Sequence, residues 1–136
     1  MKLHTEIITL CDYALISREG KLSINGIFDE LRVKKFPGGI ARAFFVATLR
    51  GKPDTSYQLQ MKVEQSGQVK ATMNLEIHTS PNGKNNIVTE LVNLGFEQAG
   101  DCKFAIYHGE DEVGATQLKV MNADEAPKPV SYKLPN

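Results

Sequence analysis

Alternation of apolar and polar side chains at every second residue constrains the fold of this chain more than any other feature. It is clearest in residues 57–63 (YQLQMKV) and 69–77 (VKATMNLEI). A period of two is that of a β-strand with one buried face. Further strand-like segments occupy residues 3–11, 42–50, 87–96, 102–107 and 113–121. Because an apolar sheet face must be buried against another layer, the sequence predicts an all-β protein, a two-sheet antiparallel β-sandwich of about seven strands.

The same alternation predicts which side chains face the core. Seven apolar residues occupy the alternate positions of these segments that we expect to face inward: Leu59, Met61, Val63, Met73, Leu75, Phe104 and Ile106. Residues 42–50 are apolar in both phases, which predicts a central strand that is covered on both faces.

Two segments permit more than one interpretation. In residues 22–33, Asn25-Gly26 has the composition of a tight hairpin turn, yet both flanks read as strand. We favour one long strand with a glycine bulge over two strands that meet at this dipeptide, because residues 22–24 are short for an independent strand. Residues 87–96 fit either a strand or one short amphipathic turn, and a strand is favoured.

Charge and length describe a single neutral domain. The 136 residues hold 16 basic and 16 acidic side chains, so no overall field draws the chain to nucleic acid or to an anionic membrane. The basic groupings, Lys34-Lys35 and Arg42 with Arg50, lack a platform of aromatic side chains on which bases would stack. We therefore expect neither a nucleic acid nor a membrane as a partner.

The N-terminal region and the cysteines indicate a cytoplasmic protein. Glu6 interrupts the apolar residues near the N-terminus, so these do not form the core of a signal peptide. Cys11 and Cys102 lie far apart in the sequence, both in strand-like segments. Two partly buried free thiols are the favoured interpretation. A bridge between strands is the alternative, and it requires α-carbons within about 7 Å.

No pattern of titratable residues indicates a catalytic, cofactor or metal site. The histidines, His4, His78 and His108, are scattered without metal-ligand spacing. An acidic turn, Glu110-Asp111-Glu112, together with Glu97 and Asp101 across the hairpin base, would offer oxygen ligands to calcium, but a solvated turn is the simpler interpretation. Carboxylates at Asp12, Asp29 and Glu30 read as charges that protect strand edges rather than as acid and base catalysts.

The C-terminal segment differs from the rest. We expect a β-sandwich domain over residues 1–121 and a proline-containing tail over residues 122–136. In the tail, Val130, Tyr132 and Leu134 alternate with polar residues, and Pro129 and Pro135 limit the length of the segment. This pattern is sufficient for one edge strand, on this chain or on a neighbour's sheet.

Two resemblances support the fold. The run AGDCKFAIY (residues 99–107), followed by EVG (residues 112–114), resembles the last two strands of immunoglobulin-like domains, although Cys102 stands where those domains place a corner tyrosine. The segments LCDYA (residues 10–14), GKLSINGIFD (residues 20–29) and Phe36-Pro37 resemble the opening of a family of uncharacterised small bacterial proteins. This resemblance spans residues 3–121 and implies a bacterial origin and no particular activity.

The function that we expect from these features is a non-enzymatic binding or self-association module of the bacterial cytoplasm. Its partner would be another protein or a second copy of the chain, because a sandwich presents edge strands and end loops for recognition. The alternative is a small-molecule-binding protein or an enzyme whose site is built from loops at one end of the sandwich.

Overall fold

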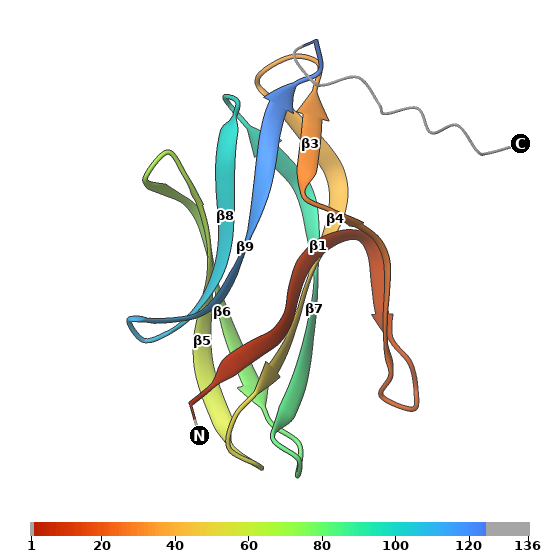
Figure 1. The fold of residues 1–136 in the computed structure, drawn as a ribbon, viewed down its shortest axis with the longest axis vertical. Coiled ribbons are helices and arrows are strands. Elements are labelled where there is room, and N and C mark those ends of the chain that lie inside the picture. The colour runs from red at the N-terminus through yellow and green to blue at the C-terminus, as the bar shows by residue number, and fades with distance from the viewer. Residues whose placement is uncertain (1, 125–136) are drawn as a thin grey trace, which may run out of the picture.

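Residues 2–124 are described by a computed structural model, in which nine β-strands form two layers (Figure 1). The strands are β1 (His4–Ile16), β2 (Leu22–Phe28), β3 (Glu30–Val33), β4 (Gly38–Arg50), β5 (Ser56–Gln65), β6 (Gln68–His78), β7 (Lys84–Phe96), β8 (Gly100–His108) and β9 (Asp111–Asn122). This part of the chain contains no helix.

The strands form a four-stranded sheet, in the order β2-β1-β4-β7, and a five-stranded sheet, in the order β3-β9-β8-β5-β6. The predicted two-sheet sandwich is confirmed. Neighbouring strands are antiparallel except for β3 and β9, which run parallel. The sandwich therefore has nine strands where about seven were expected, and it includes one parallel pair.

Residues 22–33 explain much of the difference. The chain breaks at Asp29, so that β2 pairs with β1 in one sheet and β3 pairs with β9 in the other. Asn25-Gly26 lies inside β2, where Gly26 has a φ of 71° and an added Cβ would lie 2.4 Å from Asp12 Oδ2. The hairpin interpretation is thus wrong, and one long strand is also wrong. The register with β1 is continuous through Gly26, so the expected bulge at this glycine is absent.

The core lies between the two sheets. Phe45 of β4 and Phe104 of β8 are fully buried and stack at a centroid distance of 6.4 Å. The predicted core residues all belong to this cluster: Leu59, Met61, Val63, Phe104 and Ile106 are buried, and Met73 and Leu75 are partly buried against it. β4 pairs with β1 on one side and β7 on the other, which confirms its central position.

β7 is a strand, as favoured, but its inward face changes phase part of the way along. Leu91 packs against the core, and so do Leu94 and Phe96. Between them, Asn93 has a φ of 53°, a left-handed conformation that rotates the following side chains to the other face. The spacing of three between Leu91 and Leu94, which also fits a helical turn, results from this rotation.

The C-terminal end of β9 lies beside the end of β3. The Ala123 amide donates a hydrogen bond of 2.9 Å to the Val33 carbonyl, one residue beyond the end of the strand. The strand-like pattern of the tail, residues 130–134, lies outside the described residues.

Candidate interaction surface

The histidines lie on three different strands and contact separate neighbours. Nδ1 of His4 on β1 is 3.1 Å from the Lys2 carbonyl, and Nδ1 of His78 on β6 is 3.0 Å from Ser56 Oγ. The ring of His108 on β8 packs edge-on against Tyr57. Within residues 2–124, no group of three or more His, Cys, Asp or Glu side chains is placed to hold a metal ion.

The acidic turn is not joined to the other carboxylates considered with it. Glu112 forms an ion pair with Lys103 and accepts a hydrogen bond of 3.4 Å from the Tyr107 hydroxyl. The hydrogen bond with Glu112 raises the pKa of Lys103. Asp101 and Glu97 lie at the opposite end of β8 from the turn, because β8 begins at Gly100 and ends at His108. The idea of a shared carboxylate site at the hairpin base is wrong.

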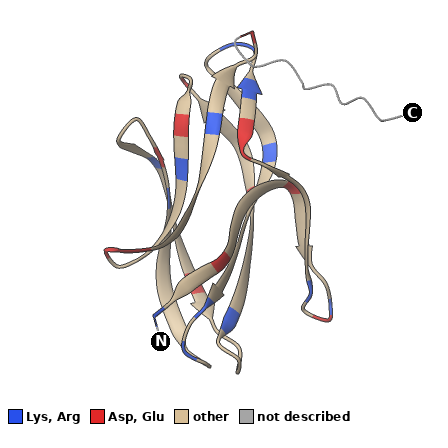
Figure 2. Cartoon of the chain, viewed as in Figure 1, with Lys and Arg blue, Asp and Glu red and all other residues tan. Residues whose placement is uncertain are grey.

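Arg42, which belongs to one of the basic groupings in the sequence, contacts two neighbouring side chains. Arg42 pairs with Glu90 at 3.3 Å and lies over the Phe44 ring, 5.1 Å from its centroid. Basic and acidic residues are interspersed on the strands of both sheets (Figure 2). This mixed distribution favours a solvated surface over a continuous basic patch.

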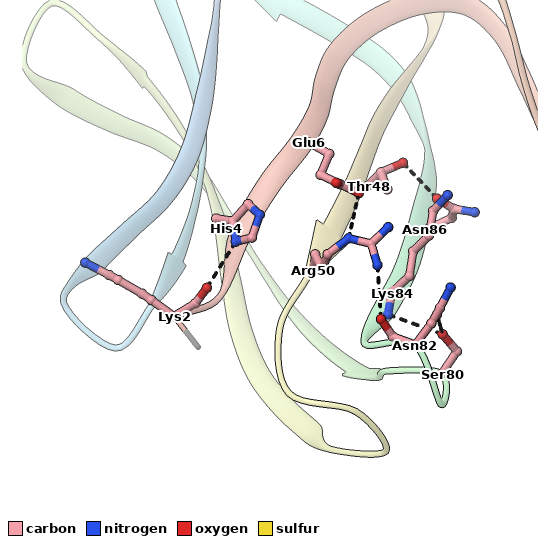
Figure 3. Close-up of polar contacts among 9 residues, drawn as sticks. All are labelled: Lys2, His4, Glu6, Thr48, Arg50, Ser80, Asn82, Lys84 and Asn86. Carbon is pink, nitrogen blue, oxygen red and sulfur yellow. Dashed lines mark hydrogen bonds and ion pairs between the residues drawn. The ribbon is translucent and has the colours of Figure 1, made fainter.

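A polar cluster joins β1, β4 and the turn between β6 and β7 (Figure 3). Arg50 of β4 pairs with Glu6 of β1 at 3.1 Å and donates a hydrogen bond of 3.0 Å to the Asn82 carbonyl. The hydrogen bond from Arg50 lowers the pKa of the Glu6 carboxyl. Nearby, Thr48 donates to Asn86 at 2.7 Å, which links β4 to β7. Arg50 therefore links β4 to β1 and to the turn between β6 and β7.

Cys11 and Cys102 are free thiols, fully buried, in different clusters. Cys102 belongs to the core between the sheets, whereas Cys11 packs with Phe44 and Val46 on the outer face of the four-stranded sheet. This arrangement agrees with free thiols and gives no support to the bridge between strands. Burial raises the pKa of Cys11, and burial raises the pKa of Cys102 from its ordinary 9.0 to about 11.

We expect the stability of the protein to fall in alkaline solution because of Cys102. Its folded pKa is raised, so the neutral thiol contributes fully below about pH 9, and the contribution is lost as the pH rises to about 11. Urea unfolding at several pH values measures this loss. The Cys102→Ala variant should show a smaller decrease over the same interval. An equal decrease in both proteins would assign the effect to other groups.

Part of the β1 and β2 hairpin extends beyond the four-stranded sheet. β1 pairs with β4 only as far as Cys11, but pairs with β2 as far as Ile16. Residues 12–27 therefore form a two-stranded ribbon, which we call the apolar ribbon. In Figure 1 the chain arches over and descends into this hairpin. Four large apolar side chains are exposed on it: Tyr13 at 47%, Leu15 at 40%, Ile16 at 45% and Ile27 at 66%.

The apolar ribbon is anchored to the sheet from which it extends. Ala14, Leu22 and Ile24 pack in one cluster with Phe44 and Val46 of β4. The Tyr13 ring meets the Phe44 ring edge-on, at a centroid distance of 5.3 Å. An isolated two-stranded hairpin is at best marginally stable, so these contacts hold the ribbon in place.

β2 differs from the other strands at the sheet edges. The other three edge strands carry charged side chains: Glu30 and Arg32 on β3, Lys70 and Glu76 on β6, and Lys84 and Glu90 on β7. β2 carries none over Leu22–Phe28. Charges on an edge discourage the addition of further strands, so among the described edges β2 is the one without this protection.

A groove of about 480 Å³ lies between the edge strands β6 and β7. Its apolar lining includes Met61, Val63, Met73, Leu91, Leu94 and Phe96. The volume is within the range of small-molecule sites, but no histidine lines the groove, and one of its two glutamates, Glu90, pairs with Arg42. The groove is built from strands of both sheets rather than from end loops, unlike the site of the expected alternative.

Comparison with known proteins identifies the fold but no activity. An immunoglobulin-like protein from Pseudomonas aeruginosa is similar over 88% of this chain and 97% of that one, with a TM-score of 0.50 and 12% identity. Two β-glucosidases are also similar, each with a TM-score of 0.50 and 10% identity. The match with the enzyme from Listeria innocua covers 89% of this chain and 16% of that one. The match with the enzyme from Bifidobacterium adolescentis covers 96% of this chain and 18% of that one. None of the curated proteins compared matches the chain.

In residues 2–124, no helix is long and apolar enough to cross a membrane. Residues 6–121 match the profile of one protein family, which agrees with the resemblance stated for residues 3–121. That match covers most of the sequence and all or most of every strand. The chain has an immunoglobulin-like β-sandwich fold and belongs to a family of unknown function (DUF6941).

Proposed function

We propose that the chain is a non-enzymatic self-association module, and that two copies meet through the apolar ribbon. The observation that carries this proposal is the edge strand β2, which has no charged side chain and on which Ile27 is 66% exposed. Strand addition to such an edge provides backbone hydrogen bonds, and burial of neighbouring apolar side chains provides further free energy.

A second copy fits this edge because the edge is self-complementary. Two antiparallel β2 strands related by a two-fold axis would join their four-stranded sheets into one continuous sheet. The ribbon's charges are Asp12 and Glu19 against Arg18 and Lys21, so they balance. The ribbon therefore has no net charge that would oppose the approach of two copies.

We expect light scattering to show a dimer of the 15.0 kDa chain, with a mass that falls on dilution. Ile27→Lys places a charge on the uncharged edge strand and should raise the dissociation constant about tenfold or more. Val69→Lys is the matched control, because Val69 is 52% exposed on the edge strand β6. It should leave association unchanged. A monomer at all concentrations, or equal effects of both substitutions, would contradict the proposal.

The bacterial cytoplasm is the compartment that we propose. Two buried free thiols are compatible with a reducing environment, and the similarity of the first half to small bacterial proteins supports the source. Alkylation of the denatured native protein should label both cysteines, whereas an oxidised pair would point to another compartment.

A further inference from the structure

The groove between β6 and β7 leaves part of the core half-covered. Met73 on β6, and Leu91 and Leu94 on β7, line the groove and pack against the core but are only partly buried. The two strands are the last strands of different sheets and share no hydrogen-bonded ladder. An extended segment placed between them would cover these side chains and meet unpaired backbone groups on either edge.

The C-terminal tail leaves the domain at the end where this groove opens. Val120 of β9 lies opposite Gly100 at the start of β8. Cys102, two residues on, lies opposite Gln65 at the end of β5, and Gln65 lies opposite Gln68 at the start of β6. Gln65 also lines the groove. The end of β9 and the groove are thus at the same end of the five-stranded sheet.

The tail is long enough to reach the groove within one molecule. In the sheet order, β6 is three strands away from β9, a distance of about 14 Å at the usual strand spacing. The six residues from Asp124 to Val130 span about 20 Å when extended. A second copy is therefore not needed to supply the segment.

The sequence of the tail matches what the groove requires. Val130, Tyr132 and Leu134 would face one side of an extended segment, and Ser131 and Lys133 would face the other. Residues 126–136 contain two lysines and no acidic residue. The groove carries Glu97 and the Arg42-paired Glu90 on its β7 side and Lys70 on its β6 side, so Glu97 is the carboxylate that would favour a lysine of the segment. We propose that residues 130–134 bind in this groove within the same chain and place Val130, Tyr132 and Leu134 on its apolar floor. This site is separate from the apolar ribbon, so the two proposals stand or fall independently.

Disulfide trapping in the full chain tests this placement. The pair Leu91→Cys and Tyr132→Cys should form an intrachain disulfide in a mild redox buffer, which peptide mapping by mass spectrometry identifies. Gln117→Cys with Tyr132→Cys is the matched control, because Gln117 is exposed on β9, five residues before the tail begins at Asn122. Docking should make the first pair form at least about tenfold faster than the control, since it raises the effective concentration at Leu91. Cys11 and Cys102 remain in place because both are fully buried.

A second pair tests the phase of the segment. Leu91→Cys with Ser131→Cys should react more slowly than the pair with Tyr132→Cys, because residue 131 faces away from the floor. Equal rates in the groove pair and the Gln117 control would overturn the proposal. A disulfide between two copies would also overturn it, by assigning the tail to a neighbour's groove.

Amide hydrogen exchange provides a readout without cysteines in the groove. A triple variant that combines Val130→Asp, Tyr132→Asp and Leu134→Asp should release the segment from the groove. Amide exchange in residues 70–75 and 91–95 should then be about tenfold faster at the positions that the tail had protected. Unchanged exchange in these ranges would contradict docking. Exchange in β8 and β9 should be the same in both proteins, which shows that the domain remains folded.

Discussion

Replacing Phe104 by alanine is expected to lower the free energy of unfolding by about 3–5 kcal/mol. The side chain is fully buried at the centre of β8 and stacks on Phe45 across the sandwich. The close-packed interior relaxes only partly around the missing ring, so the substitution loses both transfer free energy and packing contacts. Urea unfolding followed by far-ultraviolet circular dichroism measures the loss.

Val69→Ala is a control for this measurement. Val69 is 52% exposed at the sheet edge, so its truncation should change the free energy of unfolding by less than about 0.5 kcal/mol. A loss below about 1 kcal/mol for Phe104→Ala would show that the ring does not face the core.

Gly39→Ala is expected to lower the free energy of unfolding by about 1–3 kcal/mol. Gly39 of β4 lies opposite Gly95 of β7. A Cβ at Gly39 would lie 1.9 Å from the Leu94 carbonyl oxygen and 2.9 Å from the Gly95 Cα, both backbone atoms. A flexible side chain cannot relieve this clash, so the two strands must move apart.

The opposite glycine provides a matched control in the same pair. A Cβ at Gly95 would meet no heavy atom within 4 Å, so Gly95→Ala should change the free energy of unfolding by less than about 0.5 kcal/mol. Denaturant titration of both variants compares them directly. Equal losses would show that the cost comes from glycine's backbone freedom and not from the close approach of β4 and β7.

The alternation of apolar and polar side chains was sufficient to predict the two layers and the core, because the apolar positions within each strand indicate which of its faces is buried. It could not predict where the chain changes sheets. The break at Asp29 depends on the pairing of β3 with residues Lys119–Asn122, which lie far along the sequence. The exposure of Ile27 could not be predicted for a similar reason, since it depends on where β1 ceases to pair with β4.

Tyr57 provides a feature that sequence analysis did not identify. Cys102, near the start of β8, stands where immunoglobulin-like domains have a corner tyrosine, and it is a buried core residue. A related contact exists at the start of β5, where the Tyr57 hydroxyl accepts a hydrogen bond of 3.0 Å from the Lys52 amide. Gly51 leaves room for this ring, because an added Cβ would lie 2.7 Å from the hydroxyl oxygen. In the sequence, this contact is indicated by Gly51, the turn that follows it and then Tyr57.

Asp29 gives the sandwich a short mechanical connection between its two layers. Only this residue separates β2, at the edge where we propose that a partner binds, from β3 in the opposite sheet. No loop is present there to absorb a displacement, so a pull on β2 is carried directly into β3. Val33, the last residue of β3, holds the Ala123 amide where the C-terminal segment begins. A force applied to the β2 edge would therefore be transmitted to Ala123, beside the start of the C-terminal segment, through the six residues Phe28 to Val33.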